Sequence, residues 1–135
     1  MKNEIRMEGL TLTVLDIKRS IDYYCNNFGF TLEWDAAPQF AMLRTGGAGG
    51  GTVGLLSWTE AEKEGATKTN PSQSKAIHVE LSIDNLDELY EALVAKEVKI
   101  DIPPHDEPWE RAMTAFDPDG YSVEIAQGRR GNPRT

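Results

Sequence analysis

A repeat within the chain places the strongest constraint on its fold. Residues 9–17 read Gly-Leu-Thr-Leu-Thr-Val-Leu-Asp-Ile, and residues 78–86 read His-Val-Glu-Leu-Ser-Ile-Asp-Asn-Leu. Both stretches alternate apolar and polar side chains, which predicts a strand with one buried face. A helix cap follows each strand: Asp16 in the first copy, and Asn85 with Glu88 as a capping box in the second. Strand and cap recur 69 positions apart (9 to 78, 16 to 85), which predicts two related modules.

Length and charge limit the functions open to the chain. Its 135 residues, of which 39% are hydrophobic, suit one compact domain, or two small modules that share one core. No apolar run approaches the roughly 20 residues that span a bilayer, and residues 1–6 lack the apolar stretch of a signal peptide. We therefore expect a cytoplasmic protein with no membrane partner. A net charge of −8 argues against a nucleic-acid partner, because phosphates attract basic surfaces.

The single cysteine, Cys25, permits no intrachain disulfide. It lies in the apolar stripe of the first predicted helix, which favours a buried core residue over a reactive thiol.

Periodicity and turn residues divide each module into four strands and one helix. Before the first helix (17–27) comes a strand near 8–15, and after it come strands at 30–34, 39–44 and 52–58. The second module repeats this order, except that the proline-rich segment 103–108, which contains His105, is expected to be an exposed turn. The whole chain, 1–135, is thus predicted to be a single domain with module 1 at 7–58, a linker at 59–75, module 2 at 76–127 and a tail at 128–135.

Alternation also assigns the sheet face that the helices leave uncovered. In the second module this face carries His78, Glu80 and Glu124. The 69-residue offset makes Gly9 the counterpart of His78 and Leu55 the counterpart of Glu124. A face with a histidine and carboxylates either packs against another surface or lines a cavity.

These motifs resemble the vicinal oxygen chelate superfamily, which contains glyoxalases, bleomycin resistance proteins and extradiol dioxygenases. The resemblance implies an α+β fold in which two paired βαβββ modules form a curved, cup-shaped mixed sheet with helices on its outer face. It also implies a homodimer. The residues that carry it span about 7–127 and comprise 14–16, 20–24, 28–30, 78–81 and, above all, Asp-Pro-Asp-Gly-Tyr-Ser-Val-Glu at 117–124.

The resemblance further implies metal-ligand positions on the first and last strands of each module. His78 and Glu124 fall on two of these positions, Gly9 falls where another histidine is usual, and the strand around Leu55 lacks the expected glutamate. Catalytic divalent metals are generally held by at least three protein ligands. We therefore predict no complete metal site and no cofactor, with a metal recruited by an unexpected ligand such as Glu8 or Glu80 as the alternative.

Three interpretations of His78 stay open: a remnant metal ligand, a polar contact for an organic molecule, or a structural histidine hydrogen-bonded to Glu124. As an acid and base, this pair also forms the candidate catalytic residues. The predicted function is binding of a small organic molecule in an aromatic-lined cup, and the alternative is a metal-dependent lyase, isomerase or dioxygenase. The candidate ligand-binding residues are Thr11, Trp34, Phe40, Leu55, Trp58, His78, Glu80, Trp109 and Glu124.

Overall fold

The chain folds into two compact units, residues 1–68 and 69–135, in a computed structural model that describes residues 3–46 and 50–128. The boundary falls inside the linker expected at 59–75. The expected tail lies outside the described residues after Gly128. No helix among the described residues is long and apolar enough to cross a membrane.

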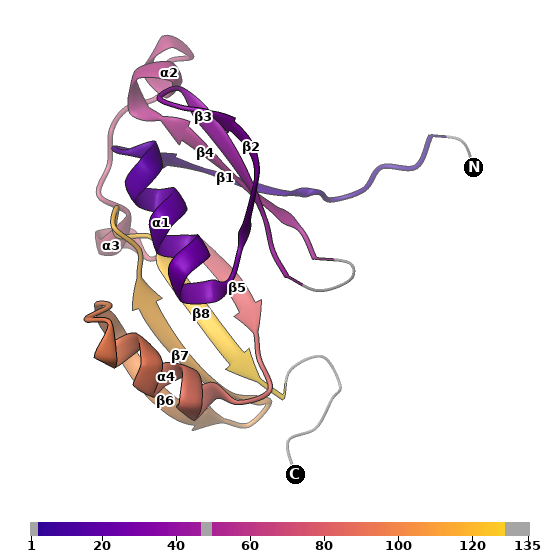
Figure 1. The fold of residues 1–135 in the computed structure, drawn as a ribbon, viewed down its shortest axis with the longest axis vertical. Coiled ribbons are helices and arrows are strands. Elements are labelled where there is room, and N and C mark those ends of the chain that lie inside the picture. The colour runs from indigo at the N-terminus through magenta and orange to yellow at the C-terminus, as the bar shows by residue number, and fades with distance from the viewer. Residues whose placement is uncertain (1–2, 47–49, 129–135) are drawn as a thin grey trace. The chain divides into compact units, whose positions relative to one another are not determined.

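The first unit contains one long helix, one short helix and a four-stranded mixed sheet (Figure 1). Its strand order is β1-β4-β3-β2, in which β1 runs parallel to β4 and the other neighbours are antiparallel. The sheet is followed by a short helix that occupies the start of the expected linker. The elements are β1 (Gly9–Val14), α1 (Ile17–Phe28), β2 (Thr31–Ala36), β3 (Phe40–Arg44), β4 (Thr52–Ser57) and α2 (Trp58–Lys63).

The second unit repeats this plan with the strand order β5-β8-β7-β6, so the predicted βαβββ module occurs twice. The prediction of an exposed turn at 103–108 was wrong, because β6 continues through both prolines to Glu107. Proline is tolerated there since β6 is an edge strand. The elements are α3 (Pro71–Ser74), β5 (His78–Ser82), α4 (Leu86–Ala95), β6 (Ile100–Glu107), β7 (Glu110–Phe116) and β8 (Ser122–Gln127).

The first long helix has the predicted caps. The Asp16 side chain accepts a hydrogen bond from the backbone N–H of Arg19 at 3.1 Å, which satisfies one of the unpaired amides of the first turn. Gly29 ends the helix with φ of 70°, in the left-handed region that glycine adopts without strain. Local sequence therefore determines both ends of α1.

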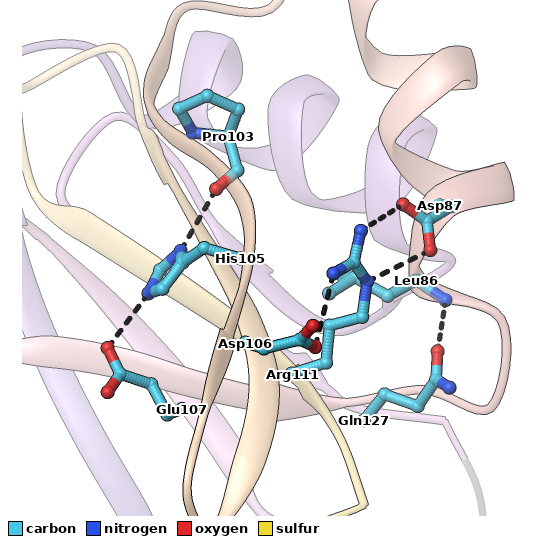
Figure 2. A network of polar contacts seen from close by, with 8 residues as sticks. All are labelled: Leu86, Asp87, Pro103, His105, Asp106, Glu107, Arg111 and Gln127. Atoms are coloured by element: carbon cyan, nitrogen blue, oxygen red, sulfur yellow. Dashed lines mark hydrogen bonds and ion pairs between the residues drawn. The ribbon is translucent and has the colours of Figure 1, made fainter.

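The cap of the second long helix differs from the prediction. Asn85 makes no side-chain capping hydrogen bond. Instead, the side-chain oxygen Oε1 of Gln127, at the end of β8, accepts from the backbone N–H of Leu86 at 2.9 Å (Figure 2). A residue 41 positions away thus replaces the predicted capping box and ties the start of α4 to the last strand.

Each unit buries one face of its sheet beneath its long helix. In the first unit Leu12, Leu43 and Leu55 are almost or completely inaccessible, together with Tyr24 of α1. In the second unit the same is true of Val79, Leu93, Met113 and Ile125. Burying each such side chain stabilises the fold by roughly 1.5–3 kcal/mol. In each unit the sheet face that carries these residues is covered, and the opposite face is the open one.

An ion-pair network also attaches α4 to its sheet. The Arg111 guanidinium on β7 lies 2.8 Å from a carboxylate oxygen of Asp87 and 3.2 Å from one of Asp106 (Figure 2). The hydrogen bond from Arg111 lowers the pKa of Asp87 below its usual value. The acidic groups are mostly exposed, so the network orients the helix more than it stabilises the fold.

Candidate functional site

The open face of the first sheet brings three predicted residues together. Thr11 lies opposite Gly54, Gly54 opposite Met42, and Met42 opposite Trp34, so one row crosses all four strands. Side chains directly opposite each other on neighbouring strands share a face. The rings of Trp34 and Phe40 meet edge to face with their centroids 5.5 Å apart, and Trp34 is 58% exposed. Thr11, Trp34 and Phe40, three of the residues expected to contact a ligand, therefore share one face of the first sheet.

Gly54 shapes this surface by having no side chain. A Cβ atom there would lie 2.7 Å from the Thr11 hydroxyl oxygen and 3.3 Å from two carbons of the Phe40 ring. Both distances are shorter than ordinary van der Waals contact. The glycine therefore allows the Phe40 ring to lie over β4 beside the Thr11 hydroxyl.

The structure corrects the placement of Leu55. Glu124 lies opposite Glu80, whose counterpart in the repeat is Thr11 (80 and 11 are 69 apart). Thr11 lies opposite Gly54, so Gly54 is the counterpart of Glu124 and the offset has grown to 70 (54 to 124). Leu55 is one residue further on and its side chain points into the core, with no exposed surface. It was wrongly predicted to contact a ligand.

Two predicted tryptophans lie apart from these strand rows. Trp58 begins α2 and is half-buried, whereas Trp109 lies in the turn between β6 and β7 and is 66% exposed. Both were expected on strands or at strand ends. Neither belongs to a row that holds Trp34 or His78.

The open face of the second sheet gathers the predicted polar residues. His78 and Glu80 lie two residues apart on β5, so their side chains share one face of the sheet, and Glu124 of β8 is the register partner of Glu80. One potential ligand atom from each of the three lies within 4.8 Å of the others. The His78 ring nitrogen Nε2 lies 2.9 Å from the backbone oxygen of Lys75. His78 and Glu80 are exposed and Glu124 is half-buried.

Sequence reasoning missed that His105 shares this face. His105 of β6 lies opposite Ala112 of β7, and Ala112 is two residues from Thr114, which lies opposite Glu124. Its Nδ1 lies 3.0 Å from the Pro103 carbonyl oxygen and its Nε2 lies 3.1 Å from a Glu107 carboxylate oxygen (Figure 2). The signal was present as His-Asp-Glu at 105–107, which repeats the spacing of His-Val-Glu at 78–80. The neighbouring prolines concealed it.

Comparison with known proteins agrees with this architecture. A profile of the Glyoxalase/Bleomycin resistance protein/Dioxygenase superfamily matches residues 6–125. The chain belongs to this superfamily. The uncharacterized protein YraH of Bacillus subtilis (strain 168) is 30% identical over 123 residues, which cover 86% of this chain and 93% of YraH.

Solved structures of the superfamily share the fold. A member from Sphaerobacter thermophilus DSM 20745 has a TM-score of 0.71 and 23% identity, covering 91% of this chain and 98% of that one. A glyoxalase/bleomycin resistance protein/dioxygenase from Nocardioides has a TM-score of 0.74 and 22% identity, covering 99% and 91%. The predicted α+β fold of paired βαβββ modules is therefore confirmed.

The ligand positions of metal-using superfamily members fit only half of this chain. The second module supplies His78 and Glu124, but the first module has Gly9 and Gly54 at the matching register positions. A Cβ atom at Gly9 would lie 1.8 Å from the backbone oxygen of Thr52, so no side chain fits there without a backbone shift. The first module therefore offers no ligand side chain at either of these two positions.

Proposed function

We propose that this superfamily member binds a small organic molecule against the open face of its first sheet. The observation that carries the proposal is the Trp34–Phe40 pair, in which an indole with 58% of its surface exposed meets a phenyl ring at 5.5 Å. Exposed aromatic surface is unfavourable in water, and small-molecule sites are lined mainly by such rings with a few polar groups.

The surroundings of this pair indicate the chemistry of the ligand. Met42 adds a flexible, polarisable thioether to the same row, and the Thr11 hydroxyl offers a hydrogen bond at the β1 end of that row. Arg44, at the end of β3, is already engaged by Glu33 in a short ion pair. These groups suit a flat, largely apolar molecule that carries a small number of hydrogen-bonding atoms.

A ligand screen with matched tryptophan variants tests this proposal. A library of aromatic compounds is screened by thermal shift, and the Kd of each hit is then measured by calorimetry on the wild type, Trp34→Ala and Trp109→Ala. Both tryptophans are exposed, so the two variants lose similar apolar surface. We expect Trp34→Ala to weaken binding about tenfold or more, since an aromatic contact is worth roughly 0.5–1.5 kcal/mol beyond its buried area. Equal affinities in the three proteins would refute the assignment.

A metal-dependent lyase, isomerase or dioxygenase is the second candidate function. It is favoured by the group formed by His78, Glu80 and Glu124, whose ligand atoms lie within 4.8 Å of one another. In such an enzyme His78, Glu80 and Glu124 would hold the metal, which would supply Lewis-acid activation of the substrate, and loss of His78 or Glu124 should abolish turnover. Turnover that survives removal of divalent metal, or that survives both His78→Asn and Glu124→Gln, would exclude it. A homodimer and a cytoplasmic location remain predictions under either function.

A further inference from the structure

One row of side chains on the open face of the second sheet gathers positive charge. Phe116 of β7 is the register partner of Ser122 on β8, which in turn pairs with His78. The backbone N–H of Phe116 donates to the Lys99 oxygen at 2.9 Å, so these two residues are neighbours at the start of β6. The ammonium nitrogens of Lys99 and Lys75 lie 5.4 and 5.7 Å from the centre of the Phe116 ring. Two cations thus share one aromatic ring in a chain whose net charge is −8.

Lys75 is held in an unusual backbone conformation beside this row. Its φ of 51° lies in the left-handed region, which residues other than glycine rarely adopt. Its backbone oxygen lies 2.9 Å from Nε2 of His78, and its ammonium group forms an ion pair with Asp101 at 3.0 Å. Backbone strain of this kind persists only where the surroundings enforce it, and it is concentrated at binding sites and switches. Contacts at both ends of the residue therefore keep the ammonium group over Phe116.

A buried hydroxyl next to the aromatic ring gives an independent indication of a ligand. Ser122 is 1% exposed, and its side chain leaves β8 on the same face as the Phe116 ring leaves β7. Its Oγ has no hydrogen-bond partner among the residues that the structure describes. A buried polar group without a partner is unfavourable, and a serine hydroxyl can donate to an anion. An acceptor oxygen held by the two lysines would satisfy this hydroxyl.

We propose that Lys75 and Lys99 bind the carboxylate group of a small organic acid, with the Ser122 hydroxyl as a further donor. Two ammonium groups and the Asp101 carboxylate leave a net charge of +1, which a singly charged carboxylate neutralises. A doubly charged oxyanion such as sulfate would leave an excess of negative charge beside Asp101. Among the described residues none forms an ion pair with Lys99, so its ammonium group is open to a ligand.

Titration of the full chain with benzoate, its neutral analogue benzamide and sulfate at low ionic strength tests the assignment. Binding is followed through the backbone amide signals of residues 75–78, 99–101 and 116–122 in nuclear magnetic resonance spectra. We expect saturable shifts with benzoate, a Kd in the millimolar range, weaker binding of sulfate and no shifts with benzamide. Lys75→Met and Lys99→Met should each raise the Kd for benzoate about threefold, as expected for partly exposed ion pairs. Lys18→Met, which removes an exposed ammonium group on α1, should match the wild type.

Two further variants separate a built site from a generally positive surface. Asp101→Asn removes the negative charge beside Lys75, so it should lower the Kd for benzoate and lower the Kd for sulfate by a larger factor. Ser122→Ala removes the unsatisfied hydroxyl, so it should weaken benzoate binding about threefold while leaving the free energy of unfolding unchanged or higher. Far-UV circular dichroism establishes that each variant is folded.

The proposal is overturned if the shifts grow linearly without saturation, if benzamide causes the same shifts, or if Lys99→Met and Lys18→Met bind benzoate alike. Tighter binding of sulfate than of benzoate by the wild type would overturn the choice of a carboxylate. All the residues of this site lie in the second unit, so Trp34→Ala should leave its affinity for benzoate unchanged. Failure of the organic-ligand proposal and failure of the carboxylate site therefore give different results.

Discussion

Truncation of Leu55 tests the strand register that moved it from the predicted site into the core. Leu55 has no exposed surface and lies opposite Leu12 on one neighbouring strand and Ala41 on the other. Leu55→Ala removes three carbon atoms, whose transfer into water costs about 2.4 kcal/mol at about 0.8 kcal/mol each. The cavity left behind raises the expected loss to roughly 3–5 kcal/mol, which is a large fraction of the stability of a small domain.

Urea unfolding followed by far-UV circular dichroism measures this loss. Leu15→Ala is the control, because Leu15 is 60% exposed and its truncation should change the free energy of unfolding by less than about 0.5 kcal/mol. If Leu55 instead lined the open face, its truncation would be comparably mild and would weaken ligand binding. A loss below about 1 kcal/mol would therefore refute the register that places Gly54, and not Leu55, opposite Thr11.

Three further predictions concern other parts of the molecule. Burial raises the pKa of the Cys25 thiol, so less thiolate forms at a given pH, and alkylation of the folded protein should require a higher pH than alkylation in urea. Gln127→Ala should destabilise the protein by about 1 kcal/mol in urea titrations, whereas Asn85→Ala should be almost neutral, because the side chain of Gln127, and not that of Asn85, caps α4. Sedimentation equilibrium should give twice the 15.0 kDa chain mass at micromolar concentration, and a monomer there would contradict the expected homodimer.

Local sequence was sufficient to predict the strands, helix ends and buried faces that depend only on residues close together in the chain. The alternation of apolar and polar residues at 9–14 and 78–82 assigned both first strands and their buried faces correctly. The cap at Asp16 and the terminating Gly29 needed no distant contact. The same alternation brought His78 and Glu124 onto one face, which was the useful part of the site prediction.

Sequence failed where the structure depends on pairing between distant segments. The prediction for Leu55 applied the 69-residue offset of the first strands to the last strands, although the second module has one more residue before β8. A one-residue slip moves a side chain to the opposite face of a strand, so Leu55 was assigned to the wrong face. The prolines near His105 indicated a turn, but an edge strand accommodates them. The capping box at Asn85 was locally plausible, yet Gln127 reaches the same amide from β8. In each case the deciding partner lies far away in the sequence.

In the first module there is no room for a metal-ligand side chain at Gly9 of β1, and the Gly9→Ala variant tests this directly. A Cβ atom at Gly9 would lie 1.8 Å from the backbone oxygen of Thr52, so β1 and β4 must move apart to accept it. We expect a loss of about 1–3 kcal/mol in urea unfolding, as for other overpacked sites. Gly46→Ala is the matched control, since nothing lies within 4 Å of its added Cβ atom. Equal stability of the two variants would contradict the close approach. A histidine carries the same Cβ atom as an alanine. Gly9→His should therefore lose at least as much unfolding free energy as Gly9→Ala, whether or not its imidazole binds a metal.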